Sequence, residues 1–157
     1  MFSNRNSNGK KQSLLEVMGN RDDLSTFAEL LTVSGVAELF DEDRQFTVFA
    51  PTNDAFAKIA TEKMNALVGE KELYKLKQLL NYHILPAKRS AAAISGMRQT
   101  GTMAGPDVRF SDRYGLKVND AALGTRNIEA RNGIVHVIDK VLAPPTAVAV
   151  MLSGSLL

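Results

Sequence analysis

The architecture follows from residues 46–56, which read Phe-Thr-Val-Phe-Ala-Pro-Thr-Asn-Asp-Ala-Phe. The first five residues are mostly aromatic or β-branched and are followed by Pro51, a pattern typical of a largely buried strand. Thr52 stands where its hydroxyl can accept a hydrogen bond from the free N–H groups of a following helix, predicted over 53–59. We therefore expect a strand that runs directly into a capped helix, with three side chains in the core: Phe46, Val48 and Phe56.

Before this block the pattern is helical. Ser13 and Glu16 form a capping box that predicts a short helix, since each side chain can bind a free main-chain N–H group of the other residue. A second helix is expected to end at Gly35 and to be capped by Asp22 or Asp23. Its apolar positions follow helical spacing: Leu24, Phe27, Ala28 and Leu31.

After the block a helix is predicted over 71–82, and beyond Pro86 the chain becomes β-like. Asn132-Gly133 is the strongest hairpin signal, because a type I′ turn needs two residues that accept positive φ. Helices come first and strands second, which predicts an α+β fold without βαβ alternation. Short strands are expected in five places: 97–103, 108–110, 116–118, 127–130 and 134–142.

The charge is unevenly distributed along these 157 residues, whose formal net charge is +2. Residues 1–11 carry three basic and no acidic side chains, and residues 12–54 carry two basic and nine acidic ones. Residues 55–117 carry eleven basic and five acidic ones, and residues 118–157 carry three of each. No basic domain with interleaved aromatic residues results, so nucleic acid is not an expected partner.

The sequence also excludes several classes of site. It contains no Cys, which removes disulfides, thiolate nucleophiles and Cys-containing zinc sites. No phosphate-binding loop, dinucleotide fingerprint, zincin motif or nucleophile elbow is present. No apolar stretch is long enough to span a bilayer, and the polar start lacks the apolar core of a signal peptide.

His83 and His136 are the sequence's candidates for acid–base chemistry or metal binding. Both lie among apolar neighbours, which favours a structural neutral ring that donates to a main-chain or carboxylate oxygen. A metal site would need both histidines and a carboxylate such as Asp139, but strand alternation points His136 and Asp139 to opposite faces. We therefore expect no catalytic residue, no metal and no cofactor.

Charged clusters offer a second kind of candidate. Asp22-Asp23 is interpreted as a helix cap and Asp41-Glu42-Asp43 as a solvated turn, not as catalytic carboxylate pairs. Six basic residues form a possible patch that either solubilises the surface or meets anionic polysaccharide or lipid headgroups: Lys88, Arg89, Arg98, Arg109, Arg113 and Lys117.

Three segments together resemble the fasciclin (fasciclin I-type) domain family. They are residues 46–56, the segment Leu80-Asn-Tyr-His-Ile-Leu85 and the closing block 133–145, whose order and spacing also match. The resemblance covers roughly residues 12–145. It implies an α+β fold with a β-sandwich wedge and a helical layer built mainly from the N-terminal half.

The resemblance also implies a role. Family members act in adhesion at the cell surface or outside the cell, so we expect a non-enzymatic, extracytoplasmic interaction module with a protein or polysaccharide partner. In animal members, a tyrosine–histidine motif and an aspartate beside an aliphatic residue are linked to integrin binding. Tyr82, His83 and Asp139 match these positions, which makes them candidate partner-binding residues without making an integrin the partner.

One alternative function is a carrier of a small apolar ligand such as a carotenoid or lipid, since some fasciclin-type proteins bind carotenoids. Three regions are expected along the chain: a disordered basic arm at 1–12, the fasciclin-like domain at 13–145, and a C-terminal extension at 146–157. The sequence assigns no oligomeric state.

Overall fold

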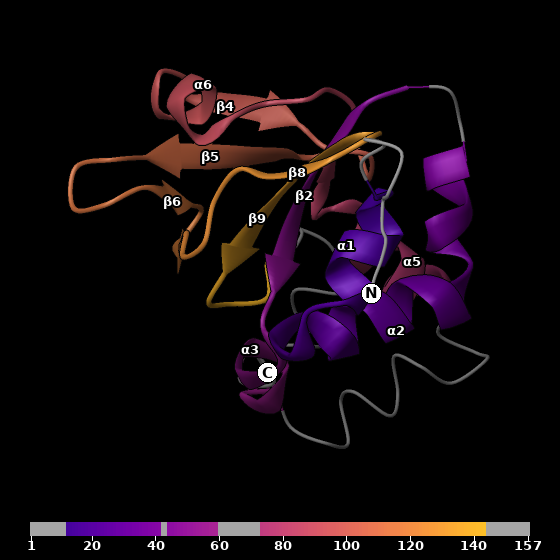
Figure 1. The fold of residues 1–157 in the computed structure, drawn as a ribbon. Helices are drawn as coiled ribbons and strands as arrows, with labels where there is room; N and C mark the ends of the chain where they lie inside the picture. Colours follow the sequence, from indigo (N-terminus) through magenta and orange to yellow (C-terminus); the bar gives the residue numbers. More distant parts are fainter. Residues whose placement is uncertain (1–11, 42–43, 60–72, 144–157) are drawn as a thin grey trace.

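Figure 1 shows three layers in the computed structural model, which describes residues 12–41, 44–59 and 73–143. Helices α1 (Leu14–Gly19), α2 (Ser25–Ser34) and α5 (Leu73–Asn81) lie on one side of a first sheet. A second sheet, with the short helix α6 (Ala91–Ser95), lies on its other side. The predicted α+β class and the sandwich with its helical layer are confirmed. The described part contains no helix long and apolar enough to cross a membrane.

The helical layer comes from the N-terminal part of the chain. It comprises α1 (Leu14–Gly19), η1 (Asp22–Leu24), α2 (Ser25–Ser34), η2 (Val36–Asp41), α3 (Asn53–Ala57) and α5 (Leu73–Asn81). The predicted capping box at Ser13 and Glu16 is present, and Gly35 ends α2 in the left-handed conformation at φ 86°. Thr52 caps α3 by accepting the N–H of Ala55 at 3.1 Å, as predicted.

The first sheet has the strand order β3-β2-β9-β8. Its strands are β2 (Phe46–Pro51), β3 (Ile84–Leu85), β8 (Ile128–Ala130) and β9 (Gly133–Ile138). β2 pairs with β9 in parallel along the whole of both strands, so the first and last predicted blocks lie side by side at the centre. Both strands are buried on both faces, which matches their nearly continuous apolar sequence.

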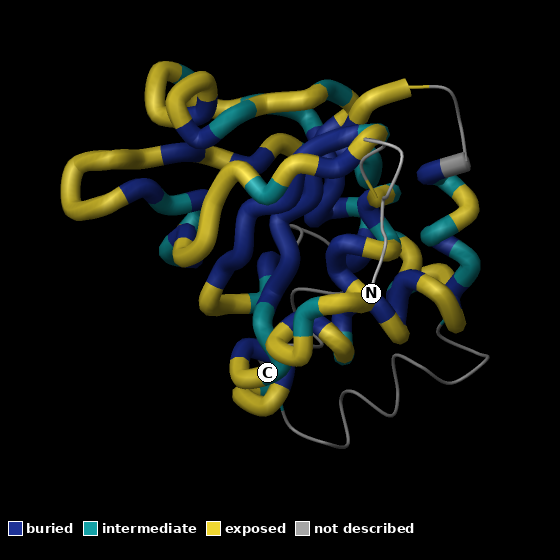
Figure 2. The backbone as a smooth tube through the Cα atoms, viewed as in Figure 1, coloured by how far each residue is buried: buried dark blue, intermediate teal, exposed yellow. Residues whose placement is uncertain are grey.

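The second sheet has the order β4-β5-β6-β7 and is antiparallel throughout. Its strands are β4 (Gln99–Gly101), β5 (Asp107–Ser111), β6 (Lys117–Val118) and β7 (Ala121–Ala122). Along β5 the residues alternate between exposed and buried, so one face of this sheet covers the core and the other meets solvent. In Figure 2 the loop between β5 and β6 projects from the body of the molecule as a continuous exposed segment.

Two apolar cores lie on opposite faces of the first sheet. Phe46 and Val48 of β2 pack with the helices, including Phe27 of α2, and all three are fully buried. Phe49 of the same strand faces the other way and packs with Phe110 of β5. The predicted core positions Phe46, Val48 and Phe56 are thus confirmed.

The predicted capping of α2 by Asp22 or Asp23 is wrong. These residues form η1 instead, and α2 begins at Ser25 without a cap from its own flanking side chain. Asn53 of α3 supplies the missing acceptor, because its Oδ1 atom accepts the N–H of Thr26 at 2.9 Å. The cap is therefore tertiary, which a search for local capping residues cannot detect.

The hairpin between β8 and β9 is confirmed, but its type I′ turn is not. Ala130 pairs with Gly133, so the two turn residues are Arg131 and Asn132, and Asn132 does not have a positive φ. The Asn132 side chain has another use. Its Oδ1 atom accepts the N–H of Leu14 at 2.8 Å, and its Nδ2 atom donates to the carbonyl of Phe40 at 3.2 Å.

Helix α6 (Ala91–Ser95) was not predicted, since the sequence after Pro86 was interpreted as β-like throughout. Ser90 caps it by accepting the N–H of Ala93 at 3.2 Å. Strands β4, β6, β8 and β9 are shorter than predicted, whereas β5 extends one residue further at each end. The turn at 42–43, the helix start at 71–72, all but the last residue of the predicted arm and the whole predicted extension lie outside the described residues.

Candidate functional site

Tyr82 joins the helical layer to the second sheet. Its side chain is almost completely buried, at 3% exposure. The hydroxyl donates to the carbonyl of Asp107 at 2.8 Å and accepts from Nδ2 of Asn119 at 3.2 Å. The Tyr82 hydroxyl thus uses its proton and a lone pair on groups inside the protein, and these bonds fix the second sheet relative to α5.

His83 is fully buried, and both of its ring nitrogens bind main-chain groups. Nδ1 donates to the carbonyl of Leu79 at 2.8 Å, and Nε2 accepts the N–H of Leu142 at 2.9 Å. Only the neutral ring with its proton on Nδ1 satisfies both partners. Burial lowers the pKa of His83 to about 4, against a smaller opposite effect of the Leu79 carbonyl.

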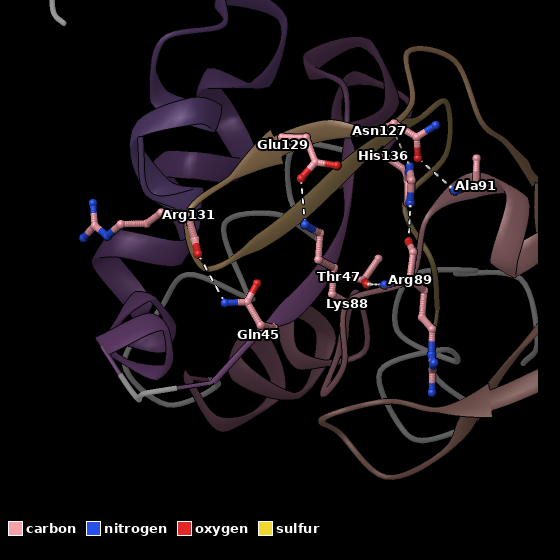
Figure 3. A network of polar contacts seen from close by, with 9 residues as sticks. All are labelled: Gln45, Thr47, Lys88, Arg89, Ala91, Asn127, Glu129, Arg131 and His136. Carbon is pink, nitrogen blue, oxygen red and sulfur yellow. Dashed lines mark hydrogen bonds and ion pairs between the residues drawn. The ribbon is translucent and has the colours of Figure 1, made fainter. Parts of the chain in front are cut away.

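His136 is the centre of a second network, drawn in Figure 3. Its Nε2 atom donates to the carbonyl of Arg89 at 2.8 Å, and its Nδ1 atom accepts the N–H of Asn127 at 3.1 Å. Asn127 in turn accepts the N–H of Ala91 through Oδ1 at 2.9 Å, at the start of α6. Desolvation is the main cause that lowers the pKa of His136. The Arg89 carbonyl acts against it, and the charge of Arg126 adds to it.

The two histidines thus take opposite tautomers and do the same work. Each ring uses one nitrogen as a donor and the other as an acceptor, and all four partners are main-chain groups. A metal ligand or a general base needs a free nitrogen lone pair. No group of three or more His, Asp or Glu side chains suited to a metal ion occurs among the described residues.

Asp139 is exposed and lies just after β9. Its Oδ1 atom accepts the N–H of Ala122 at 2.8 Å, which attaches the end of β9 to β7. Within the described residues, the Asp139 carboxylate makes no hydrogen bond to Tyr82 or His83, and each of the three side chains binds different groups. Tyr82 and His83 are also buried, and the part of all three in partner binding stays a prediction.

The six basic residues of the predicted patch come from two parts of the structure, and their action as one patch stays a prediction. Lys88 lies beside the first sheet and makes an ion pair with Glu129 of β8 at 2.7 Å, visible in Figure 3. Arg89 follows it, held by its main chain to His136 and to the hydroxyl of Thr47. The other four belong to the second sheet and its loops: Arg98, Arg109, Arg113 and Lys117.

Tyr114 was not among the predicted site residues, although it lies beside Arg113 in the loop between β5 and β6. It is 84% exposed, more than any other large apolar side chain of the described residues. The sequence signal that could have indicated it is a tyrosine between an arginine and a glycine, with charged residues nearby on both sides. Tyr and Arg are the residue types that most often dominate protein–protein interfaces.

The sequence analysis also did not predict an open hollow of about 390 Å³. It lies where η1 meets the start of α3 and is lined by Asp22, Asp23, Thr52, Asn53 and Asp54. Asp23 is already paired with Arg21 at 3.0 Å, and the Asn53 amide is spent on Thr26 and on the Asp22 carbonyl. These polar groups hold the local fold together.

Comparison with known proteins shows which family this sequence matches. Residues 22–144 match the Fasciclin domain family. "Protein sll1483" of Synechocystis is 34% identical over 134 residues, covering 85% of this chain and 74% of that protein. Human periostin is 31% identical over 137 residues, which cover 86% of this chain and 16% of periostin. Cell surface glycolipoprotein MPB83 of Mycobacterium bovis is 36% identical over 102 residues, covering 64% of this chain and 44% of MPB83.

A solved structure has the same fold. It is a FAS1 domain pair from the insect cell adhesion molecule Fasciclin I, with a TM-score of 0.58 and 23% sequence identity. The match covers 76% of this chain and 45% of the solved one. This chain therefore spans most of the length of its cyanobacterial relative and only a minor part of periostin and MPB83.

Proposed function

Because this chain belongs to the Fasciclin domain family, we propose that it is a non-enzymatic interaction module that binds a protein partner at a cell surface or outside the cell. Two comparisons support this location and role. MPB83 is named as a cell surface glycolipoprotein, and the structural relative comes from a cell adhesion molecule.

One observation carries the proposal. The groups best suited to chemistry, which are the rings of His83 and His136, bind main-chain groups through both nitrogens. The residue types best suited to contact, Tyr114 with its neighbour Arg113, are instead exposed. Tyr and Arg are enriched among the residues that contribute most to binding at protein–protein interfaces.

The alternative functions have less support. A carrier of a carotenoid or lipid needs apolar space between the layers, but the wedge between helices and first sheet is filled by a continuous set of buried side chains. The hollow near α3 is lined by polar residues. A polysaccharide partner remains the rival within the same class of function, and the experiment below separates it from a protein.

Binding of the fluorescently labelled domain to intact cells of its source tests the proposal. One sample of cells is treated with a protease that removes surface proteins, and a second with periodate, which destroys sugars. We expect saturable binding that protease removes and periodate leaves unchanged. No saturable binding, or binding that only periodate removes, would overturn the proposal.

A further inference from the structure

The solvent face of the second sheet carries a row of cations. Arg109 and Ser111 are two apart in β5 and lie on its exposed face. Lys117 of β6 is directly opposite Ser111, so its side chain leaves the sheet on the same side as Arg109. Arg113 follows two residues after Ser111, in the exposed loop. We call Arg109, Arg113 and Lys117 the basic strip.

The charges of the basic strip are not balanced by neighbours. Within residues 12–41, 44–59 and 73–143, the structure gives none of its three side chains a hydrogen bond or ion pair. Three carboxylates lie near it in sequence. Asp107 accepts from Nε2 of Gln99 at 2.7 Å, Asp120 pairs with Lys140 at 3.4 Å, and Asp112 is in the exposed loop. Two of the three are engaged by other side chains, so the net charge along the strip is positive, which favours an anionic partner.

Tyr114 adds an anchor at one end of the basic strip. The loop that carries it is exposed at every residue from 112 to 115 and stands out from the body in Figures 1 and 2. An aromatic ring of this exposure contributes little to the fold and, once covered, contributes apolar area and a hydroxyl to an interface.

We infer that the basic strip and Tyr114 dock an extended acidic segment of a partner protein. This inference rests on the proposed function and names the chemistry of its partner. The proposed function makes the partner a protein, and an extended acidic segment offers the carboxylates that complement these cations. The guanidinium groups of Arg109 and Arg113 bind carboxylates in a bidentate manner.

The test measures the binding of the purified domain to immobilised poly-L-glutamate by biolayer interferometry. Polygalacturonate, a carboxylated polysaccharide, is the second probe at matched carboxylate density. We expect salt-sensitive binding to poly-L-glutamate that exceeds binding to polygalacturonate. Each single change, Arg109→Ala, Arg113→Ala or Lys117→Ala, should weaken it about threefold, as expected for exposed ion pairs. Tyr114→Ala should weaken it about tenfold, as expected for an aromatic anchor.

Two control variants match these changes on another face. Tyr74→Ala removes a tyrosine that is 66% exposed on α5, and Lys77→Ala removes an exposed cation from the same helix. Both should leave binding unchanged. The inference is overturned if the wild type does not bind poly-L-glutamate, if it prefers polygalacturonate, or if the controls weaken binding as much as Arg113→Ala. Protease-sensitive binding to cells would persist in these cases if only the inference, and not the proposed function, were wrong.

Discussion

The Nε2 atom of His83 accepts a hydrogen bond from the main-chain N–H of Leu142 at 2.9 Å, although the two residues are 59 positions apart. The same ring donates to the carbonyl of Leu79 in α5, so it connects the end of α5 to the chain that follows β9. Both ends of this connection are buried. The ring therefore has a structural role, and we expect its removal to lower the free energy of unfolding.

Replacing His83 by Phe keeps an aromatic ring, although a larger one, and leaves the Leu142 N–H without an acceptor. An unsatisfied buried donor costs about 1–3 kcal/mol, and we expect a loss of that size in the free energy of unfolding. Urea denaturation at pH 7.5 measures it. Tyr74→Phe, on an exposed face, is the matched control and should change stability by less than about 0.5 kcal/mol. Equal stability of His83→Phe and wild type would show that the hydrogen bonds of the His83 ring do not stabilise the fold.

The lowered pKa of His83 predicts that acid destabilises the fold. The folded ring has a pKa of about 4 and the unfolded ring one near 6.5, so the unfolded chain takes up the proton first as the pH falls. Stability is therefore complete above pH 6.5, decreases from 6.5 to 4, and is not reduced further by this group below 4. His83 alone accounts for about 3 kcal/mol over that interval.

The pKa of His136 is also lowered, which adds to this effect with the same sign. Urea denaturation at pH 7.5, 5.5 and 4.5 gives the slope for the wild type, and His83→Phe should show a smaller one. A wild-type stability that does not change between pH 7.5 and 4.5 contradicts the buried, neutral state of both rings.

Asn53→Ala tests the tertiary cap of α2. The change removes the acceptor of the Thr26 N–H and also the donor to the Asp22 carbonyl, so a loss of about 1–2 kcal/mol is expected. Asp22→Ala removes one of the two residues that the sequence offers as a cap, Asp22 and Asp23, and should cost less than about 0.5 kcal/mol. Thermal unfolding of the two variants compares their losses of stability. A larger loss for Asp22→Ala than for Asn53→Ala would show that Asp22, and not Asn53, caps α2.

Gly133→Ala tests the contact between the two central strands. A Cβ atom at Gly133 would overlap the carbonyl oxygen of Phe46, and main chain cannot move aside as a flexible side chain can. We expect a loss of about 3 kcal/mol or more, measured by urea denaturation. Gly19→Ala is the control, because a Cβ there meets nothing within 4 Å. That variant should be as stable as the wild type, and a Gly133→Ala protein of equal stability would contradict the close approach.

The sequence predicts what depends on near neighbours in the chain. Thr52 caps α3 and Ser13 caps α1 because each acceptor lies three residues from its donor. Asn53 and Asn132 could not be assigned in this way, since their partners belong to other elements. Helix α6 has only five residues, too few to be stable alone, and depends on the packing of Ala91 and Ile94 in the second core.

The candidate site shows the same division. The motif around Tyr82 and His83 was found from sequence, but its burial depends on which elements cover it. The six basic residues were also found, but the sequence does not show that Lys88 pairs with Glu129. Nor does it show that Arg109 and Lys117 share one face of the second sheet, which follows from the strand register. Tyr114 was missed because exposure, and not residue type alone, makes it a candidate anchor.

Binding of the domain to intact cells, compared between wild type, Arg113→Glu and Tyr74→Ala, tests most directly that this protein works by contact with a protein. The predicted result is saturable wild-type binding that surface protease treatment removes, a loss of at least about fivefold in affinity for Arg113→Glu, and none for Tyr74→Ala. Equal binding before and after protease treatment, with Arg113→Glu indistinguishable from wild type, would contradict the account.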